Sequence, residues 1–323
     1  MKKVIVLYNL NHHEYEYETE FDSEITIDAI RNALSKKYEV ELVEVKRDFS
    51  WIDYLIKSKP DLVFNVCEGY KGPARESVYA AILEQLGILY TGPDSTNLLM
   101  CHNKLMVKKL MSRLVNVPKG FVVRTIGDLN KLPELKYPVI VKLNSEGSSI
   151  GLSEKSIVYS LEDLSKRVEF LHKNYESNIL IEEYIEGTDI SMIYIEGIGP
   201  LGPCLVQCNS MFYDYEMKTT KDDTVEIEVM SGNYQELYDI VKIIVHRLDI
   251  KGYAKIDFRV NESGYYLIEV NGQVSFHPTG EFITCAKTKG YSLEEVILHI
   301  ADSMLKTKQK EYSIGIGDDY GIA

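Results

Sequence analysis

Residues 252–272, GYAKIDFRVNESGYYLIEVNG, decide the fold because they contain two β-rich segments joined by a turn that ends in glycine. Side chains two residues apart on a strand share a face, so Lys255 and Asp257 point the same way. Glu269 and Asn271 repeat this arrangement on the partner strand, between apolar neighbours. The sequence therefore predicts a hairpin with one polar face.

This polar face carries two carboxylates and a carboxamide. Asp257, Glu269 and Asn271 supply hard oxygen ligands of the kind Mg²⁺ prefers when it keeps water and substrate phosphate in its shell. We expect one or two Mg²⁺ ions here, with Mn²⁺ as a substitute. The alternative is an amphipathic hairpin with an ordinary solvated face. The other motifs have to decide between the two.

A small-residue loop follows a strand-like segment earlier in the chain, in residues 142–151, KLNSEGSSIG. Glycine and serine let backbone N–H groups and hydroxyls approach phosphate oxygens closely. A plain turn is the alternative interpretation. Lys142 at the strand end and Lys104 in the segment HNK favour a phosphate site, because a carboxylate can approach a triphosphate only where cations offset the repulsion.

The chain alternates element types in a way that predicts three units and a tail. Residues 1–95 alternate β-rich and amphipathic segments, typical of βαβ units around a parallel sheet. Residues 96–187 mix helices with antiparallel strands, and residues 188–310 contain hairpins, two helices and the polar hairpin. Residues 311–323 form a loose tail. The expected fold class is α/β combined with α+β.

Composition excludes several classes of function. The net charge of -13 disfavours non-specific binding to nucleic acid or anionic lipid. No stretch approaches the roughly 20 apolar residues of a membrane span, and the N-terminus does not resemble a signal peptide. Five scattered cysteines suggest reduced core thiols in the cytoplasm, and Cys204 and Cys208 lack the partners of a zinc site. We expect a cytoplasmic protein.

Six segments, taken in order, resemble the ATP-grasp superfamily and, within it, the D-alanine–D-alanine ligase-like group. The resemblance covers most of the chain. It implies an N-terminal Rossmann-like (pre-ATP-grasp) domain, a central domain and a C-terminal domain, with ATP clamped between two α+β domains. The segments are LEQLGILYTG with the following HNK, PVIVKLNSEGSSIG, ILIEEYIEGTDIS, FYDYEMK, GYAKIDF and LIEVNG.

The resemblance implies roles for individual residues in binding ATP. Asp257, Glu269 and Asn271 match Mg²⁺ ligands, in agreement with the argument from the shared face. The residues that match the nucleotide site are Lys104 and Lys142 at the phosphates, Ser148 and Ser149 in the loop that covers them, Glu182 at the adenine amino group, Ile185 at the base and Asp189 at the ribose hydroxyls.

The resemblance also implies a mechanism. A substrate carboxylate attacks the γ-phosphate of ATP, and an amine then attacks the acyl phosphate. Charge neutralisation and positioning accomplish this, so no covalent enzyme intermediate is needed. Lys255, Ser148 and Lys218 occupy the catalytic positions, and Lys218 belongs to a loop that closes over ATP. Lys255 replaces an arginine of the family pattern and lacks its planar fork.

The departures from the D-alanine pattern concern the substrate end. Glu16 lies in an acidic, tyrosine-rich segment where the family has a glycine-rich turn, and it either binds an amine or belongs to a solvated surface. Glu68 replaces a histidine and, with Arg75, either reads a different substrate or belongs to a tight turn. His277 lies in a loop without the family's Pro-Gly-x-Thr turn, where it orients a substrate or only packs the turn.

The sequence therefore predicts an ATP-dependent, ADP-forming carboxylate–amine ligase that acts on amino acids or small peptides. D-alanine is one of the candidate substrates, so a true D-alanine–D-alanine ligase of cell-wall synthesis is one alternative. A nucleotide-binding protein without ligase activity and a phosphotransferase are others. Neither nucleic acid nor membrane is expected as a partner, and a homodimer formed through the first domain is a family expectation.

Overall fold

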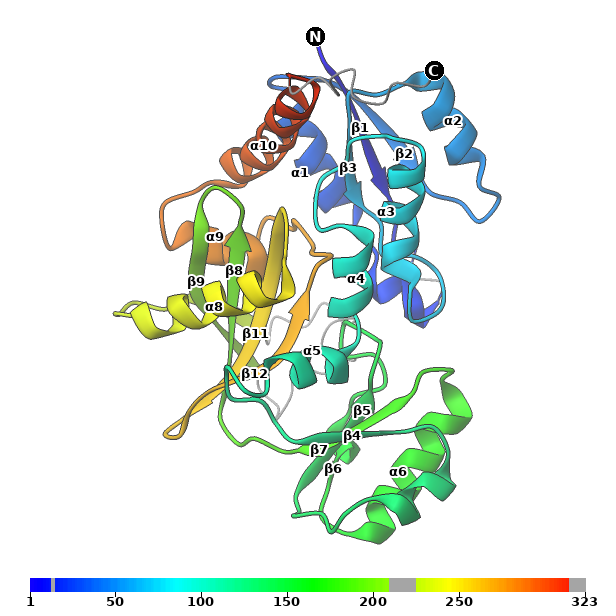
Figure 1. The fold of residues 1–323 in the computed structure, drawn as a ribbon, viewed down its shortest axis with the longest axis vertical. Helices are drawn as coiled ribbons and strands as arrows, with labels where there is room; N and C mark the ends of the chain where they lie inside the picture. Colours follow the sequence, from blue (N-terminus) through cyan, green and yellow to red (C-terminus); the bar gives the residue numbers. More distant parts are fainter. Residues whose placement is uncertain (13–14, 209–224, 314–323) are drawn as a thin grey trace, which may run out of the picture.

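Three β-sheets organise the part of the chain that this computed structural model describes, residues 1–12, 15–208 and 225–313. Figure 1 shows a parallel sheet at one end of the molecule, a four-stranded sheet with α6 at the other, and a five-stranded sheet between them. No helix in these residues is long and apolar enough to cross a lipid bilayer. Four cysteines in the described part of the chain are buried free thiols.

The first sheet is parallel, as its alternating segments predict, and its strand order is β2-β1-β3. Both faces are covered: Val4 and Val6 belong to a core with α1 and α10, while Ile5 and Leu7 belong to a core with α2 and α3. The elements are β1 (Lys3–Tyr8), α1 (Glu24–Leu34), β2 (Glu39–Glu44), α2 (Ser50–Ser58), β3 (Leu62–Val66), α3 (Arg75–Gln85) and α10 (Leu293–Ser313).

The second sheet is antiparallel, with the order β4-β7-β5-β6. Helix α6 packs its buried leucines and Val168 against one face, and this leaves the other face for a ligand. The elements are β4 (Gly120–Val123), η2 (Ile126–Lys131), β5 (Val139–Leu143), η3 (Glu154–Ser156), β6 (Ile157–Val158), α6 (Leu161–Asn174) and β7 (Ile179–Glu183).

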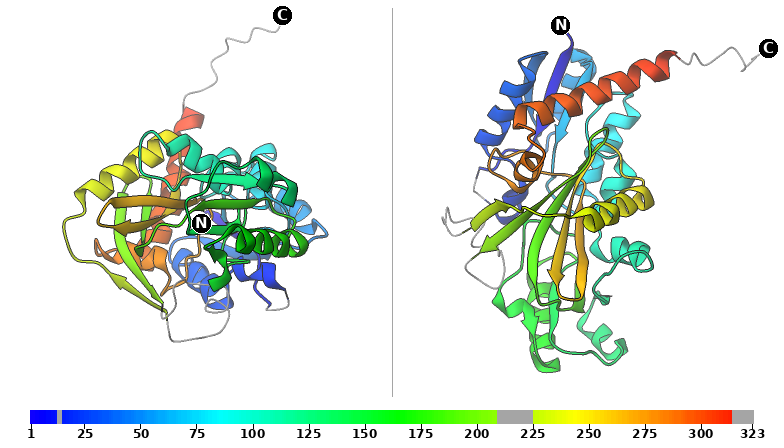
Figure 2. Two further views of the ribbon diagram at one scale, coloured as in Figure 1. Left: turned by 90° about the horizontal axis from the view of Figure 1, so that it is seen from below. Right: turned by 90° about the vertical axis from the view of Figure 1, so that its left-hand side faces the viewer.

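The third sheet has the order β10-β9-β8-β11-β12 and contains the predicted hairpin as β11 and β12. Helix α8 covers one face (Figure 2). The elements are α4 (Ser95–Cys101), α5 (Lys104–Met111), β8 (Thr188–Ile195), β9 (Gly199–Cys208), β10 (Val225–Val229), α8 (Gln235–Leu248), β11 (Tyr253–Asn261), β12 (Gly264–Asn271) and α9 (Glu281–Lys287).

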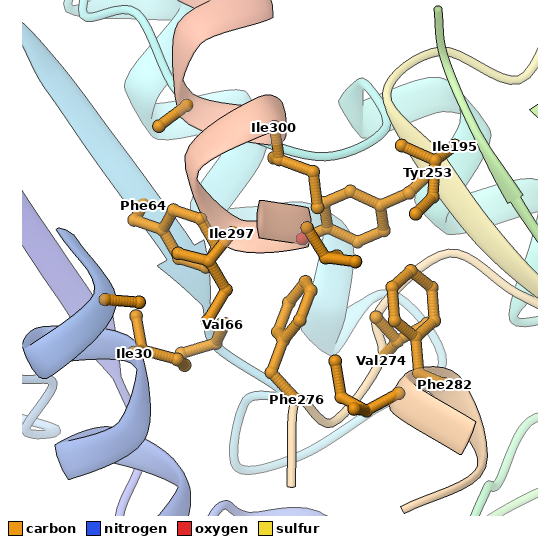
Figure 3. Close-up of a cluster of buried hydrophobic side chains, with 14 of the residues drawn as sticks. Ile30, Phe64, Val66, Ile195, Tyr253, Val274, Phe276, Phe282, Ile297 and Ile300 are labelled. Carbon is orange, nitrogen blue, oxygen red and sulfur yellow. The ribbon is translucent and has the colours of Figure 1, made fainter. Parts of the chain in front are cut away.

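An aromatic cluster joins the first and third sheets. Phe276, from the loop after β12, is fully buried, and its ring lies 5.4 Å from both Phe64 of β3 and Tyr253 of β11. Phe282 of α9 lies 5.1 Å from Phe276. Figure 3 shows these four rings gathered beside Ile297 and Ile300 of α10. The cluster therefore fixes the loop after the polar hairpin against the first sheet.

The hydrophobic cores do not follow the order of the chain. Val107 and Met111 of α5 lie in the core of the third sheet, although α5 precedes the second sheet in sequence. Helix α10 closes the chain but packs with α1 on the first sheet. The boundaries after residues 95, 187 and 310 therefore stay a proposal about how the chain divides.

Candidate active site

The β11–β12 hairpin brings the three predicted metal ligands together. Asp257 lies opposite Glu269 in the register of the two strands. The amide nitrogen of Asn271 lies 3.0 Å from Asp257 Oδ2 and 3.5 Å from Glu269 Oε1, and a flip of this amide would turn its oxygen toward them. No group of three or more His, Cys, Asp or Glu side chains suited to a metal is found in the described ranges, so water and phosphate would have to complete the shell.

The two hairpin carboxylates differ in their electrostatic surroundings. Burial raises the pKa of Asp257 to about 7, although Lys255 lies 3.0 Å away and opposes this shift. Burial also disfavours ionised Glu269, but Lys104, at 3.2 Å, and other lysines outweigh it and hold the pKa of Glu269 well below its ordinary range. The hairpin therefore lacks the positive charge that would keep both carboxylates ionised, and a bound cation would supply it.

Glu182 on β7 binds two lysines at the buried end of the pocket. Its carboxylate oxygens lie 2.5 Å from Lys142 of β5 and 2.5 Å from Lys108 of α5. Burial lowers the pKa of Lys108 to about 7, while burial of Glu182 is outweighed by the two lysines, which lower the pKa of that carboxyl. Glu182 therefore stays ionised as an acceptor at the position predicted for the adenine amino group.

The predicted phosphate loop is a tight turn between β5 and β6. Ser148 and Ser149 have φ angles of 45° and 59°, a left-handed conformation that turns the backbone sharply. The N–H of Gly147 donates to Glu20 Oε1 at 2.7 Å, and a Cβ on Gly147 would lie 2.4 Å from that oxygen. A larger residue at position 147 would therefore have to displace the Glu20 carboxylate.

One pocket between the second and third sheets collects most of the predicted nucleotide residues. Ile185 and Asp189 lie where β7 passes into β8, and Asp189 pairs with Arg259 of β11 at 2.5 Å. The predicted residues that line this pocket are Lys104, Lys142, Ser149, Glu182, Ile185, Asp189, Lys255, Asp257 and Glu269.

Arg75 is the centre of a buried network at the other side of the phosphate loop. Its guanidinium donates to Glu20 at 3.0 Å and to the carbonyl oxygen of Ser145 at 3.2 Å, and it lies 3.1 Å from Glu146. Nη1 also lies 2.8 Å from Nε2 of His102. Arg75 therefore holds the loop in place, and these partners occupy the fork predicted to read a substrate.

His102 bridges Arg75 and Glu76. Its Nδ1 lies 2.6 Å from Glu76 Oε1, so the proton on Nδ1 faces the carboxylate and Nε2 accepts from the arginine. The residue after His102 caps α5: Asn103 Oδ1 accepts from the N–H of Met106 at 3.0 Å. The network therefore connects α3, the start of α5 and the phosphate loop.

Two acidic residues lie beside this network at the predicted substrate end. Glu68 is half-buried, and burial, followed by Glu76, Glu20 and Asp22, raises its pKa well above the ordinary value. Burial also raises the pKa of Asp22 to about 7, although Ser275 donates to it at 2.6 Å. A cationic group on a substrate would relieve both carboxyls.

Comparison with known families identifies the chain. The family model described as the D-ala D-ala ligase C-terminus matches residues 128–302, which include the polar hairpin and, apart from β4, the strands of both antiparallel sheets of the pocket. The chain belongs to the D-alanine–D-alanine ligase family. The D-alanine–D-alanine ligase of Aquifex aeolicus is 31% identical over 261 residues, 80% of this chain and 87% of that protein. That of Thermotoga petrophila is 28% identical over 281 residues, 83% and 88% of the two chains.

Solved structures of D-alanine–D-alanine ligases share the fold. The Bacillus anthracis enzyme complexed with ATP matches with a TM-score of 0.76 at 19% identity, covering 96% of this chain and 100% of that one. The VanG D-Ala:D-Ser ligase of Enterococcus faecalis gives a TM-score of 0.73 at 19% identity and covers 94% and 99%. The predicted ATP-grasp fold is confirmed. So is the enzyme class, because the D-alanine–D-alanine ligase family consists of ATP-dependent, ADP-forming C–N ligases.

Two candidates for the substrate end, Glu16 and His277, lie apart from these contacts. Glu16 is exposed and accepts from the hydroxyl of Tyr175 at 2.9 Å, so Glu20, one helical turn later, makes the contact with Arg75 instead. His277 Nδ1 accepts from the hydroxyl of Thr279 at 3.1 Å within its own turn. Lys218 lies outside the described residues.

Several polar contacts in the pocket of this D-alanine–D-alanine ligase homologue were not predicted from the sequence. Arg259 continues the alternation of Lys255 and Asp257 along β11, and this period alone is enough to find it. Lys108 follows Lys104 by one helical turn. Three other contacts cannot be found from the local sequence. Ser191 donates to Asp257 at 2.6 Å, Glu281 pairs with Lys255, and Glu20 pairs with Arg75.

The raised pKa of Asp22 predicts a pH effect on the stability of this D-alanine–D-alanine ligase homologue. Between about pH 4 and pH 7 the folded state binds more protons than the unfolded state at Asp22, so this residue makes stability fall as pH rises. We compare the free energy of unfolding of Asp22→Asn with that of the wild type at each pH by urea unfolding. We expect the difference, variant minus wild type, to be about 1–3 kcal/mol more favourable to the variant at pH 8 than at pH 5.

The exposed carboxylate of Asp53 on α2 provides the control for lost negative charge. Asp53→Asn gives the baseline for removing one surface charge from a chain of net charge -13. A stability difference between Asp22→Asn and the wild type that stays the same at both pH values would contradict the assignment of a buried titrating carboxyl.

Proposed function

We propose that this ATP-dependent ligase activates a substrate carboxylate as an acyl phosphate and joins it to an amine. The observation that carries the proposal is the pocket between the two antiparallel sheets, which is lined by a carboxylate pair, by three lysines and by a strand-to-strand hinge. The lysines and the carboxylate pair with its cation suit a triphosphate, and the hinge suits a purine base. The site supports binding of ATP with its γ-phosphate toward Asp257 and Glu269.

The donor set of the hairpin fits a divalent cation. Asp257 and Glu269 are partly buried and lie opposite each other, the raised pKa of Asp257 indicates too little positive charge around that carboxyl, and Asn271 adds a carboxamide oxygen. Bound Mg²⁺ would supply charge neutralisation and Lewis acidity at the phosphate oxygens. The remaining neutralisation falls to the chain itself.

Lysines and the phosphate loop do the rest of the work in this proposal. Lys104 and Lys142 neutralise the phosphates, and backbone N–H groups next to Ser148 cover them. The carboxylate oxygen of the first substrate attacks the γ-phosphorus, and ADP leaves. The amine of the second substrate then attacks the acyl carbon, phosphate leaves, and the amine loses a proton. Lys255 lies on the same strand face as Asp257 and would stabilise the oxyanion of the tetrahedral intermediate. Lys218 stays a prediction.

The substrates we propose are amino acids or small peptides, with D-alanine as one candidate. The departures from the family pattern favour a different pair of substrates. Both oxygens of Glu20 accept hydrogen bonds, one from Arg75 and one from the N–H of Gly147. Glu68 is therefore the carboxylate that we propose for a substrate amine. Lys255 shares its charge with Glu281. His277 remains a candidate for the acceptor. Action in the cytoplasm and a homodimer are also proposals.

The proposal is tested with the purified chain, ATP, Mg²⁺ and a panel of L- and D-amino acids and dipeptides supplied in pairs. We expect ADP and phosphate to be released in equal amounts, together with a product whose mass equals the two substrates minus water. The controls omit one substrate or replace Mg²⁺ by a chelator, and each should stop product formation. Release of no ADP with any pair would contradict the ligase proposal, and a stable phosphorylated product without an amide would indicate phosphotransfer instead.

A further inference from the structure

Arg259 is the third polar residue on the pocket face of β11, after Lys255 and Asp257. All three line the pocket, so one strand face runs from the carboxylate pair to the hinge. Arg259 lies directly opposite Asp189 in the register of β11 and β8 and is only 8% exposed. A buried arginine in a pocket has to be explained by its partners.

Each of the three guanidinium nitrogens donates to one of two groups of the hinge region. Nε donates to Asp189 Oδ1 at 2.7 Å, and Nη2 donates to Oδ2 at 2.5 Å. Nη1 donates to the backbone carbonyl of Ile185 at 3.3 Å, and the group lies 5.6 Å from the ring centre of Tyr184. Arg259 therefore connects the residue proposed for the ribose with the residue proposed for the base.

This pairing leaves Asp189 able to bind a sugar. A two-point contact with arginine uses one lone pair on each carboxylate oxygen, and the outer lone pairs remain free to accept from hydroxyls. The Asp189 side chain is 41% exposed, so those outer lone pairs are accessible from the pocket. Without the arginine, a carboxylate exposed to this degree would sample several rotamers. Binding a hydroxyl would then cost the conformational entropy that is lost when the carboxylate is ordered.

We propose that Arg259 is a positioning residue that orients Asp189 and fixes the Ile185 hinge, and that it thereby sets the preference of the pocket for ribonucleotides over deoxyribonucleotides. The proposal rests on the nucleotide site of the proposed function. Lysine cannot replace arginine here, because a single ammonium cannot hold two carboxylate oxygens and a carbonyl in one plane. The role is distinct from the chemistry at Asp257, so it can be measured by binding alone.

The experiment measures dissociation constants for ATP, 2′-deoxy-ATP and 3′-deoxy-ATP with Mg²⁺ and without other substrates. We expect the wild type to bind ATP about 10-fold more tightly than at least one deoxy analogue. In Arg259→Met the affinity for ATP should fall about 10-fold more than that for the discriminated analogue, because both lose the fixed hinge but only ATP loses the oriented carboxylate, so the preference collapses. Arg259→Lys should also lose most of the preference. The control is Arg247→Met, an exposed position on α8, which should match the wild type.

Each outcome bears on one of the two proposals. A wild type that binds no ATP would overturn the nucleotide site itself and, with it, the proposed function. A wild type that binds all three nucleotides equally would overturn the inference about the sugar. If Arg259→Met weakens all three nucleotides by the same factor, or keeps the wild-type preference, Arg259 has no role in sugar recognition. Should Arg259→Met fail to fold, Arg259→Lys decides, because its retained preference would also overturn the inference.

Discussion

Glu269→Gln and Asp257→Asn should each reduce turnover by about 10³-fold or more, while ATP binding weakens by only about 10-fold. Each substitution removes an anionic oxygen from the carboxylate pair and keeps the shape of the side chain. The divalent cation then loses a ligand at the point where charge develops on the γ-phosphate. Binding suffers less, because Lys142 and the hinge still hold the nucleotide. Turnover is measured as ADP release with the substrate pair that the panel identifies, and binding is measured by calorimetry.

The matched control lies on the same hairpin. Glu262 is exposed in the turn between β11 and β12, so Glu262→Gln removes the same charge from the same element without touching the pocket. Its turnover should equal that of the wild type. Wild-type turnover in either Glu269→Gln or Asp257→Asn would count decisively against the assigned metal ligands.

Arg75→Met should lower the free energy of unfolding by about 3–5 kcal/mol. The substitution leaves Glu20 and Glu146 buried without their cation, and it removes the donor from the Ser145 carbonyl and from His102. The free-energy cost of a buried carboxylate without a cation exceeds the stabilisation gained from packing the methionine. The measurement is urea unfolding, with the midpoint compared at an unchanged denaturant dependence.

Arg47 offers a matched control close to the same segment. It is exposed and stacks on the rings of Tyr17 and Tyr70, at 5.6 Å and 4.8 Å. Arg47→Met should therefore cost less than about 1 kcal/mol. Adding Glu20→Gln to Arg75→Met should recover part of the loss, because the stranded charge is then removed as well. If Arg75→Met costs no more than Arg47→Met, the buried network does not stabilise the fold.

The arrangement of the hairpin follows from local rules and was therefore predictable. The alternation of polar and apolar residues in residues 253–271 requires Asp257 and Glu269 to share a face, whatever the rest of the fold does. The parallel pairing of the first sheet likewise follows from short β-rich segments separated by amphipathic helices. In each case the determining contacts lie close together in the chain.

The loop after the hairpin shows where this kind of prediction stops. Its sequence departs from the family pattern, and nothing local indicates that Phe276 packs between Phe64 and Tyr253. The acidic segment near the N-terminus is similar. Glu16 and Glu20 are equivalent as sequence, but only Glu20 reaches the phosphate loop. A helical turn separates them, and the position of that turn against Gly147 depends on contacts with residues far along the chain.

The sequence by itself determined the fold, the ATP-dependent ligase class and the face that carries Asp257 and Glu269. The shared face follows from the period of two along each strand, and the fold and the ligase class follow from the resemblance of six ordered segments to the family. Tertiary structure decided that Arg75 is held by Glu20, Glu146 and His102, and that Arg259 clamps Asp189. The physical reason is that a charge can be buried only where partners from distant segments converge on it, and that convergence exists only after the sheets have packed.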